Sequence, residues 1–212
     1  MGTKFKKKHV GNFGVSGSFS FYPTKQITTG EGGMVLTNDY NFYKKIKSLK
    51  AFGIDKDIKD RKKQGDYDVK SLGFNYRMTD FQAALGLNQI VKYTINLRQR
   101  HIIAKRYIKN FMNNKKIKHM PYSKNCSFFI FQIFCKNRDK ILKELKNKKI
   151  GVSVHYSNAL PKMTYYKKKY NLNIGKFKNA DNYGCTNISL PVYPKLKMTE
   201  VDKICKTIIG LI

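Results

Sequence analysis

A single lysine, Lys25, lies between an aromatic, strand-like run and a glycine-rich turn in SFSFYPTKQITTGEGGMVLTN, residues 18–38. A strand that ends in tyrosine-proline-threonine holds the next side chain, that of Lys25, in a fixed position. Gly30, Gly32 and Gly33 then allow positive φ and a close approach of the backbone to a ligand. Desolvation favours the neutral form of a lysine amine, which can attack a carbonyl carbon. The alternative is one more solvated surface lysine, but these neighbours favour a nucleophile.

The chain carries a formal net charge of +30, which raises the question of a nucleic-acid or anionic-membrane partner. Only six of its 43 basic residues are arginines, and the 37 lysines are spread over the whole chain instead of forming one stripe. Arginine reads phosphates and base edges through paired hydrogen bonds, whereas lysine is a solvated point charge. We therefore expect no specific nucleic-acid partner. Steep salt dependence together with sequence preference would revive that alternative.

The four cysteines form no CxxC pair, and the first residues, MGTKFKKKH, are charged and unlike a secretory leader. Free thiols in a reducing compartment are therefore expected, which indicates a cytoplasmic protein. The longest apolar run, SFFIFQIF at 127–134, is too short for a membrane helix and suits a buried strand. We expect no membrane span.

The elements that must position Lys25 follow from hydrophobic periodicity. Residues 18–37 predict a strand, a loop and a strand, and residues 42–52 predict an amphipathic helix ended by the following glycine. A long helix begins after Thr79, whose capping box is completed by Gln82. Its apolar residues form two faces, with Phe81, Ala84, Leu85, Val91 and Ile95 on one and Leu87 and Ile90 on the other. We expect this helix to lie between a sheet and a subunit interface.

A second set of elements follows residue 118. At 212 residues with 41% apolar content, the chain has room for one ordinary domain or two small ones. The order of elements predicts a small α+β domain appended to part of a larger α/β domain. The expected elements are a strand at 127–135, a helix at 139–148, a strand at 151–156, a loop, a strand at 188–192, and a helix that begins at Thr199 with Asp202 completing its cap.

Two motifs together resemble the DegT/DnrJ/StrS family of sugar aminotransferases, which are fold-type I enzymes dependent on pyridoxal phosphate. The first motif is the segment around Lys25, where serine, phenylalanine, a short spacer, the cofactor lysine and glycine-glutamate-glycine-glycine occur in order. The second is GFNYRMTDFQAALGLNQI at 73–90, with an asparagine-tyrosine-arginine-methionine block before a long helix. Weaker similarity continues in GVSVHY at 151–156 and ISLPVYPKLKMTEVDKI at 188–204. The resemblance covers nearly the whole chain.

The resemblance implies the C-terminal part of a fold-type I large domain over residues 1–113, followed by a small C-terminal α+β domain over residues 114–212. It implies an enzyme that moves an amino group from glutamate to a keto-sugar nucleotide in cell-surface polysaccharide or lipopolysaccharide biosynthesis. The cofactor would be pyridoxal 5'-phosphate, glutamate and 2-oxoglutarate would be the donor pair, and the assembly would be a homodimer. No metal is implied.

By the same resemblance, Lys25 would hold the cofactor and transfer the proton, and Ser20 would bind the cofactor phosphate. Asn75 would reach that phosphate from the neighbouring subunit. Arg77, His155 and Tyr156 would contact the substrate.

Each assignment except that of Tyr156 has a plainer alternative. Ser20 could satisfy backbone groups at the end of its strand, and Asn75 could be an ordinary loop residue. Arg77 could anchor its loop through backbone carbonyls, and His155 could be a structural or rim histidine.

The sequence departs from the family pattern in two places. The family lysine usually lies near mid-chain, so an upstream half is expected before residue 1, with the aspartate that pairs with the pyridine nitrogen. In HYSNALPK, Asn158 and Leu160 replace a proline and a second histidine that family members commonly have, which leaves the sugar open. A dehydratase variant of the family would carry histidine in place of Lys25, so the lysine argues against it.

Three hypotheses therefore stay open. The chain is one part of a split or truncated enzyme that needs a second chain for the upstream half, a catalytically silent remnant or interaction module, or a basic nucleic-acid-binding protein. A neighbouring reading frame that encodes the upstream half would favour the first hypothesis, and its absence would favour the second.

Overall fold

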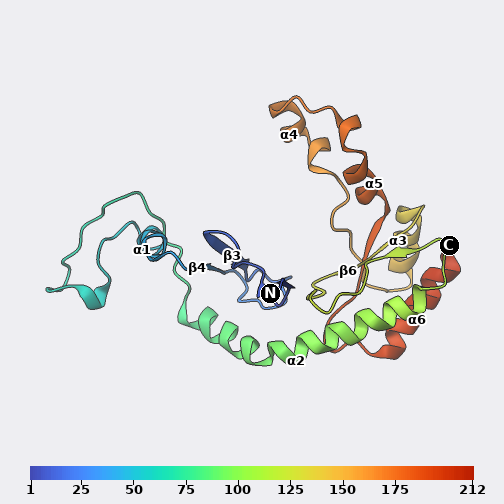
Figure 1. Cartoon of the computed structure of the whole chain (residues 1–212), viewed down its shortest axis with the longest axis horizontal. Coiled ribbons are helices and arrows are strands. Elements are labelled where there is room, and N and C mark those ends of the chain that lie inside the picture. Colours follow the sequence, from blue (N-terminus) through green and yellow to red (C-terminus); the bar gives the residue numbers. More distant parts are fainter. The chain divides into compact units, whose positions relative to one another are not determined.

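The computed structural model describes all residues, 1–212, and divides into two units within one long helix. The first unit is Met1–Thr94 and the second is Ile95–Ile212. Helix α2, Asp80–Phe111, runs from one into the other, and the element order can be followed by colour in Figure 1. The architecture is mixed α/β, as expected. A domain boundary after residue 113 stays a prediction.

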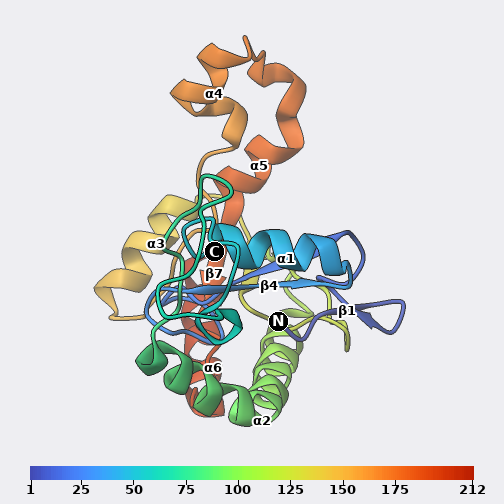
Figure 2. The same ribbon diagram turned by 90° about the vertical axis from the view of Figure 1, so that its left-hand side faces the viewer.

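The first unit contains the predicted strand, loop and strand. Strand β3, Ser16–Ser20, pairs antiparallel with β4, Gly33–Thr37, in a register that places Ser20 opposite Gly33. Helix α1, Tyr40–Leu49, lies beside β4 (Figure 2). The carboxylate of Asp39 caps this helix by accepting from the Phe42 amide at 2.9 Å. The remaining elements are strands β1 (Lys4–Phe5) and β2 (Lys8–His9) and a short 3₁₀ helix, η1, at Ile58–Asp60.

Few apolar side chains of the first unit are buried. Phe21 and Ile27 are its buried large hydrophobic residues, whereas consecutive residues of β4 remain 40–45% exposed. Successive side chains of a strand point to opposite faces, so neither face of β4 is covered within this chain. A two-stranded ribbon is marginally stable by itself. The first unit therefore presents an apolar surface that the chain itself does not cover.

Helix α2 begins with the predicted capping box. The Thr79 hydroxyl accepts from the backbone amide of Gln82 at 3.3 Å, and the side-chain oxygen of Gln82 accepts from the backbone amide of Thr79 at 3.0 Å. The apolar residues of its first half are largely exposed, at Phe81, Leu85, Leu87, Ile90, Val91 and Ile95.

The second unit is built on a three-stranded antiparallel sheet in the order β5-β6-β7. Its central strand, β6, places Phe131 opposite Leu190 of β7. The strands and main helices are β5 (Lys118–His119), β6 (Phe131–Phe134), β7 (Asn187–Leu190), α3 (Arg138–Asn147) and α6 (Met198–Leu211). These agree with the predicted strand, helix, strand and helix, apart from their bounds.

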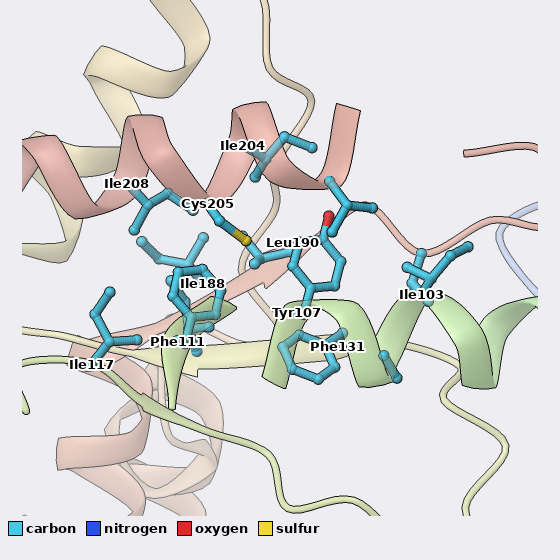
Figure 3. Packing of buried hydrophobic residues seen from close by; sticks show 14 of the residues in the cluster. Ile103, Tyr107, Phe111, Ile117, Phe131, Ile188, Leu190, Ile204, Cys205 and Ile208 are labelled. Atoms are coloured by element: carbon cyan, nitrogen blue, oxygen red, sulfur yellow. The ribbon is translucent and has the colours of Figure 1, made fainter. Parts of the chain in front are cut away.

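The hydrophobic core lies in the second unit (Figure 3). Tyr107 of α2 stacks on Phe131 of β6 with ring centroids 5.0 Å apart, and its hydroxyl donates to the Pro191 carbonyl at 2.9 Å. Burial raises the pKa of Tyr107. Helix α6 adds Val201, Ile204, Cys205 and Ile208 from one face, as the three-to-four-residue spacing of its apolar positions requires.

Two expectations for the second unit are wrong. Residues 151–156 form one isolated bridge, Ser153 with Ser189, instead of a strand. The ladder ends there because the His155 amide donates to the side-chain oxygen of Asn187 at 3.1 Å. Helix α6 begins at Met198, and Glu200 accepts from the Lys197 amide at 2.9 Å, so the cap is not formed by Thr199 and Asp202.

The expected loop between residues 157 and 187 contains further helices. These are η2 (Leu160–Lys162), α4 (Thr164–Lys169), η3 (Ile174–Phe177) and α5 (Lys178–Thr186). Helix α4 buries no residue, and it projects away from the sheet of this unit in both Figure 1 and Figure 2. None of the helices combines the length with the apolar composition that a membrane-spanning segment requires.

Candidate functional site

Lys25 lies in a tight turn directly after strand β3. Its amide donates to the Tyr22 carbonyl at 2.9 Å, and its side chain is half-buried. Ser20 ends the strand, and its hydroxyl accepts from the Tyr22 amide at 3.3 Å. The structure thus holds the predicted lysine and serine at the two ends of one ordered turn. Part of the plainer interpretation of Ser20 also holds, because its hydroxyl does satisfy a strand-end amide.

Helix α2 holds the loop that follows Lys25. Gln89 makes two hydrogen bonds with the Thr28 backbone: its oxygen accepts from the amide at 3.1 Å, and its nitrogen donates to the carbonyl at 2.5 Å. The Tyr93 hydroxyl contacts the side-chain oxygen of Gln26 at 3.2 Å. Gln82 donates to the Glu31 carbonyl at 3.0 Å. Positions 82, 89 and 93 fall on one helical face, which faces this loop.

The glycine turn approaches the second motif closely. Gly32 has φ of +151°, and a Cβ atom at that position would lie 3.1 Å from the terminal methyl of Met78. The Thr29 hydroxyl donates to the Glu31 carbonyl at 2.7 Å. The two motifs that carry the family resemblance are therefore in direct contact, and Glu31 orders the turn through its backbone.

Asn75 and Arg77 lie in an extended segment docked on the end of α1. Asn75 forms a bridge with Ala51, and its side-chain oxygen accepts from the Arg77 Nε at 3.2 Å. The Arg77 guanidinium lies 4.9 Å from the centre of the Phe52 ring. Both side chains are exposed, and Asn75 does not contact Ser20 within this chain.

Arg77 lines an open cavity of about 770 Å³ between α1 and the segment that follows it. Seven basic side chains and three carboxylates line it, so its electrostatic potential favours an anion. Lys47 and Asp57 pair within the lining. The basic residues are Lys44, Lys47, Lys50, Lys56, Lys59, Arg61 and Arg77.

His155 and Tyr156 form a corner in the second unit. Their rings meet edge to face with centroids 5.3 Å apart. Tyr156 is 70% exposed, whereas His155 is partly buried against Ser189.

Sequence reasoning missed several residues that position these groups. No role was expected for Gln89 and Tyr93 in the long helix, or for Asn187 directly before the expected strand at 188–192. The spacing of Gln89 and Tyr93 from Gln82 indicates that all three lie on one helical face, and this pattern could have identified them. Nothing in the local sequence indicated that Asn187 would be buried.

The donor set of the first unit fits pyridoxal phosphate in part. A half-buried primary amine suits the aldehyde of the cofactor, and an exposed hydroxyl five residues earlier suits its phosphate. Gly32 keeps the turn that follows Lys25 tight, because a Cβ atom there would clash with the Thr29 hydroxyl oxygen.

The structure closely matches solved sugar aminotransferases. The structure superimposes on Helicobacter pylori PseC, an aminotransferase involved in the biosynthesis of pseudoaminic acid, with a TM-score of 0.89, 29% identity, and coverage of 99% of this chain and 56% of that one. A Streptococcus pneumoniae protein assigned as a sugar aminotransferase gives TM-scores of 0.90 in its PMP form and 0.88 in its PLP form. Its identity is 28% and 27%, over 99% of this chain and 56% and 55% of the other. The chain therefore has the fold of a little more than half of a pyridoxal-phosphate-dependent sugar aminotransferase.

Residues 1–209 match the model of the DegT/DnrJ/EryC1/StrS aminotransferase family, and the chain belongs to this family. The UDP-4-amino-4,6-dideoxy-N-acetyl-beta-L-altrosamine transaminase of Campylobacter jejuni is 33% identical over 219 residues, which cover 100% of this chain and 56% of that protein. The chain thus spans little more than half the length of the relatives it matches. The family assignment expected from the two motifs is confirmed.

Proposed function

We propose that this chain is the lysine-bearing part of an aminotransferase that moves an amino group from glutamate to a keto-sugar nucleotide. The observation that carries the proposal is the contact between the Lys25 loop and the segment from Met78 to Gln89, which joins both family motifs in one ordered site. The nucleotide-linked sugar named for the Campylobacter jejuni relative supports the substrate class. Cell-surface polysaccharide or lipopolysaccharide synthesis is the corresponding role.

The residues of the first unit have distinct parts in this function. The Lys25 amine would hold the aldehyde end of the cofactor and would carry the proton to and from the carbon that bears the transferred nitrogen. The Ser20 hydroxyl would donate a hydrogen bond to the cofactor phosphate. Bound pyridoxal phosphate supplies an electron sink at that carbon. Gln82 and Gln89 fix the loop that follows Lys25 before substrate binds. No ordering of this loop is then needed on substrate binding.

Arg77 binds the anionic end of the substrate. Its guanidinium lines a cavity with excess positive charge. A nucleoside diphosphate is an anion whose phosphate oxygens can accept paired hydrogen bonds from a guanidinium. His155 and Tyr156 contact the sugar.

The uncovered apolar surface supports an assembly larger than one copy of this chain. Exposed β4 and the apolar residues in the first half of α2 require covering by other polypeptide. We propose that one part of this surface packs against the remaining half of the fold, present on the same or a separate chain. Another part forms a homodimer in which Asn75 reaches the phosphate of the neighbouring site.

The test is an absorbance titration of the purified chain with pyridoxal phosphate, compared with Lys25→Ala and with Lys45→Ala, an exposed lysine of α1, as the control. We expect a saturable band that requires Lys25, persists in the control, and disappears on addition of glutamate. The titration is repeated with the unmatched part of the Campylobacter jejuni transaminase added as a separate polypeptide. A band that appears only in the mixture would show that the other half is required. The absence of a Lys25-dependent band in both titrations would refute the proposal and favour a silent interaction module.

A further inference from the structure

Asn187, at the start of β7, is completely buried, and both polar atoms of its amide group bind the corner at residues 155 and 156. Its oxygen accepts from the His155 amide at 3.1 Å. Its nitrogen donates to the Tyr183 carbonyl at 2.8 Å and to the Tyr156 carbonyl at 3.3 Å. One side chain therefore ties the corner to helix α5. Buried polar groups of this kind specify one geometry, because any other arrangement leaves them unpaired.

Gln132 of β6 supports the same corner from the opposite side. It is 4% exposed, and its nitrogen donates to the His155 carbonyl at 2.9 Å. Its oxygen accepts from the Tyr183 hydroxyl at 2.5 Å. The backbone amide of His155 and the backbone carbonyls of His155 and Tyr156 are thus all bound by buried side chains.

Gly184 lets helix α5 touch the corner directly. A Cβ atom there would lie 2.6 Å from the Ser157 carbonyl oxygen, so a larger residue would displace the loop. The buried contacts therefore come from β6, β7 and α5 together.

Ser189 acts on the imidazole ring of His155. Its hydroxyl oxygen lies 2.9 Å from Nδ1, and the Ser153 hydroxyl lies 3.4 Å from the same atom. Ser189 is 3% exposed, and Nδ1 is the only hydrogen-bond partner of its hydroxyl. If Nδ1 carried the proton, the buried hydroxyl hydrogen would have no acceptor. The satisfied arrangement is Ser189 donating to an unprotonated Nδ1, which places the imidazole proton on Nε2.

We propose that Ser189 and Asn187 are positioning residues, which hold His155 as an Nε2–H donor toward an oxygen atom of the ligand. This inference rests on the substrate contact assigned above to His155 and Tyr156. The Nε2 atom has no hydrogen-bond partner in the structure, and the exposed Tyr156 ring stands edge to face beside it. A suitable ligand has a hydroxyl or carbonyl oxygen that accepts from Nε2–H and an apolar face that packs on the Tyr156 ring. A sugar has both features.

The primary test is the tautomer of His155 in the full chain, read from long-range ¹H–¹⁵N spectra at a pH where imidazoles are neutral. His119 is an internal control, because its Nδ1 lies 2.9 Å from the Met120 carbonyl and must carry the proton. Assignment uses His155→Gln and His119→Gln. We expect opposite tautomers, with Nε2–H at His155 and Nδ1–H at His119. A proton on Nδ1 of His155 would overturn the proposal.

Ser189→Ala removes the hydroxyl with little change in volume, and we expect its His155 signals to move toward a mixture of tautomers. Ser189→Thr restores a hydroxyl and should restore the Nε2–H signature. A structural role alone would leave the tautomer unchanged in Ser189→Ala, and that outcome would also contradict the proposal. Asn187→Ser shortens the amide, and the His155 amide should then exchange with solvent at least about tenfold faster. If Asn187→Ser does not fold, the His155 tautomers of the wild type and of Ser189→Ala still test the proposal.

These readouts need neither cofactor nor catalysis. Loss of the Lys25-dependent absorbance band would contradict the proposed function while leaving the tautomer result intact, so the two failures are distinguishable.

Discussion

Burial decides the reactivity of the four cysteine thiols. Desolvation raises the pKa of Cys135 and the pKa of Cys205 to about 11, so both are protonated at neutral pH. Cys185 is exposed. We expect a thiol reagent at neutral pH to label Cys185 first and to spare Cys135 and Cys205 until the chain is denatured. Mass spectrometry of the labelled peptides checks the order. Early labelling of either buried cysteine in the native protein would show that the core of the second unit opens readily.

Asp202 links α6 to α2 through charge-assisted hydrogen bonds. Arg106 donates to it at 2.7 and 2.6 Å, and Asn110 donates at 2.8 Å. These donors lower the pKa of Asp202 to about 2 in the folded protein. Because an unfolded aspartate has a higher pKa, near 3.9, the carboxylate stabilises the fold above roughly pH 4. That stabilisation is lost as the pH falls toward 2.

Thermal unfolding of wild type and Asp202→Asn as a function of pH tests this linkage. The wild type should have the higher midpoint near neutral pH, and the difference should shrink as the pH falls from about 4 toward 2. Arg106→Gln should show the same trend, and the double variant should be no less stable than the sum of the singles implies. A difference that does not vary with pH would mean that the pair contributes packing and not charge.

At the scale of elements, helix α2 determines where the Lys25 loop lies. Gln89→Ala removes two hydrogen bonds to the Thr28 backbone. We expect residues 26–31 to exchange amide hydrogens roughly tenfold faster, which corresponds to about 1.4 kcal/mol. Asn88→Ala, one position along the helix, is the matched control because Asn88 contacts Lys92 of the same helix. Equal exchange in the two variants would show that the loop is held by other contacts.

The strand pair β3–β4 and helices α1 and α2 follow local rules and were therefore predictable. Thr79 and Gln82 form a capping box that any chain with this spacing can form. The absence of the expected strand at 151–156 was not predictable in this sense. Backbone groups of this segment are taken by Asn187 and Gln132, which lie more than 20 positions away in the sequence and become neighbours only after folding.

At the scale of the whole molecule, stability is concentrated in the second unit. All members of the main hydrophobic cluster lie between residues 103 and 208. Leu145→Ala should lower the free energy of unfolding by about 2–5 kcal/mol, because Leu145 is completely buried. Val35→Ala should change it by less than about 0.5 kcal/mol, because Val35 is 42% exposed in this chain. Urea denaturation measures both.

Binding of additional polypeptide to the first unit would increase the effect of Val35→Ala. If additional polypeptide packs on β4, Val35→Ala should weaken that association while leaving the stability of the isolated chain unchanged. Equal effects of Val35→Ala with and without the added polypeptide would indicate that β4 is not part of the interface.

The sequence by itself determined the family, the lysine and the order of most elements. Glycine turns, capping residues and short motifs act through the backbone within a few positions, so their chemistry is visible in the printed residues. Only the tertiary structure decided what holds the site: Gln89 and Tyr93 against the Lys25 loop, and Asn187 and Ser189 against His155. A hydrogen bond between side chains far apart in sequence depends on burial and on the path of the chain between them, and neither has a local signature.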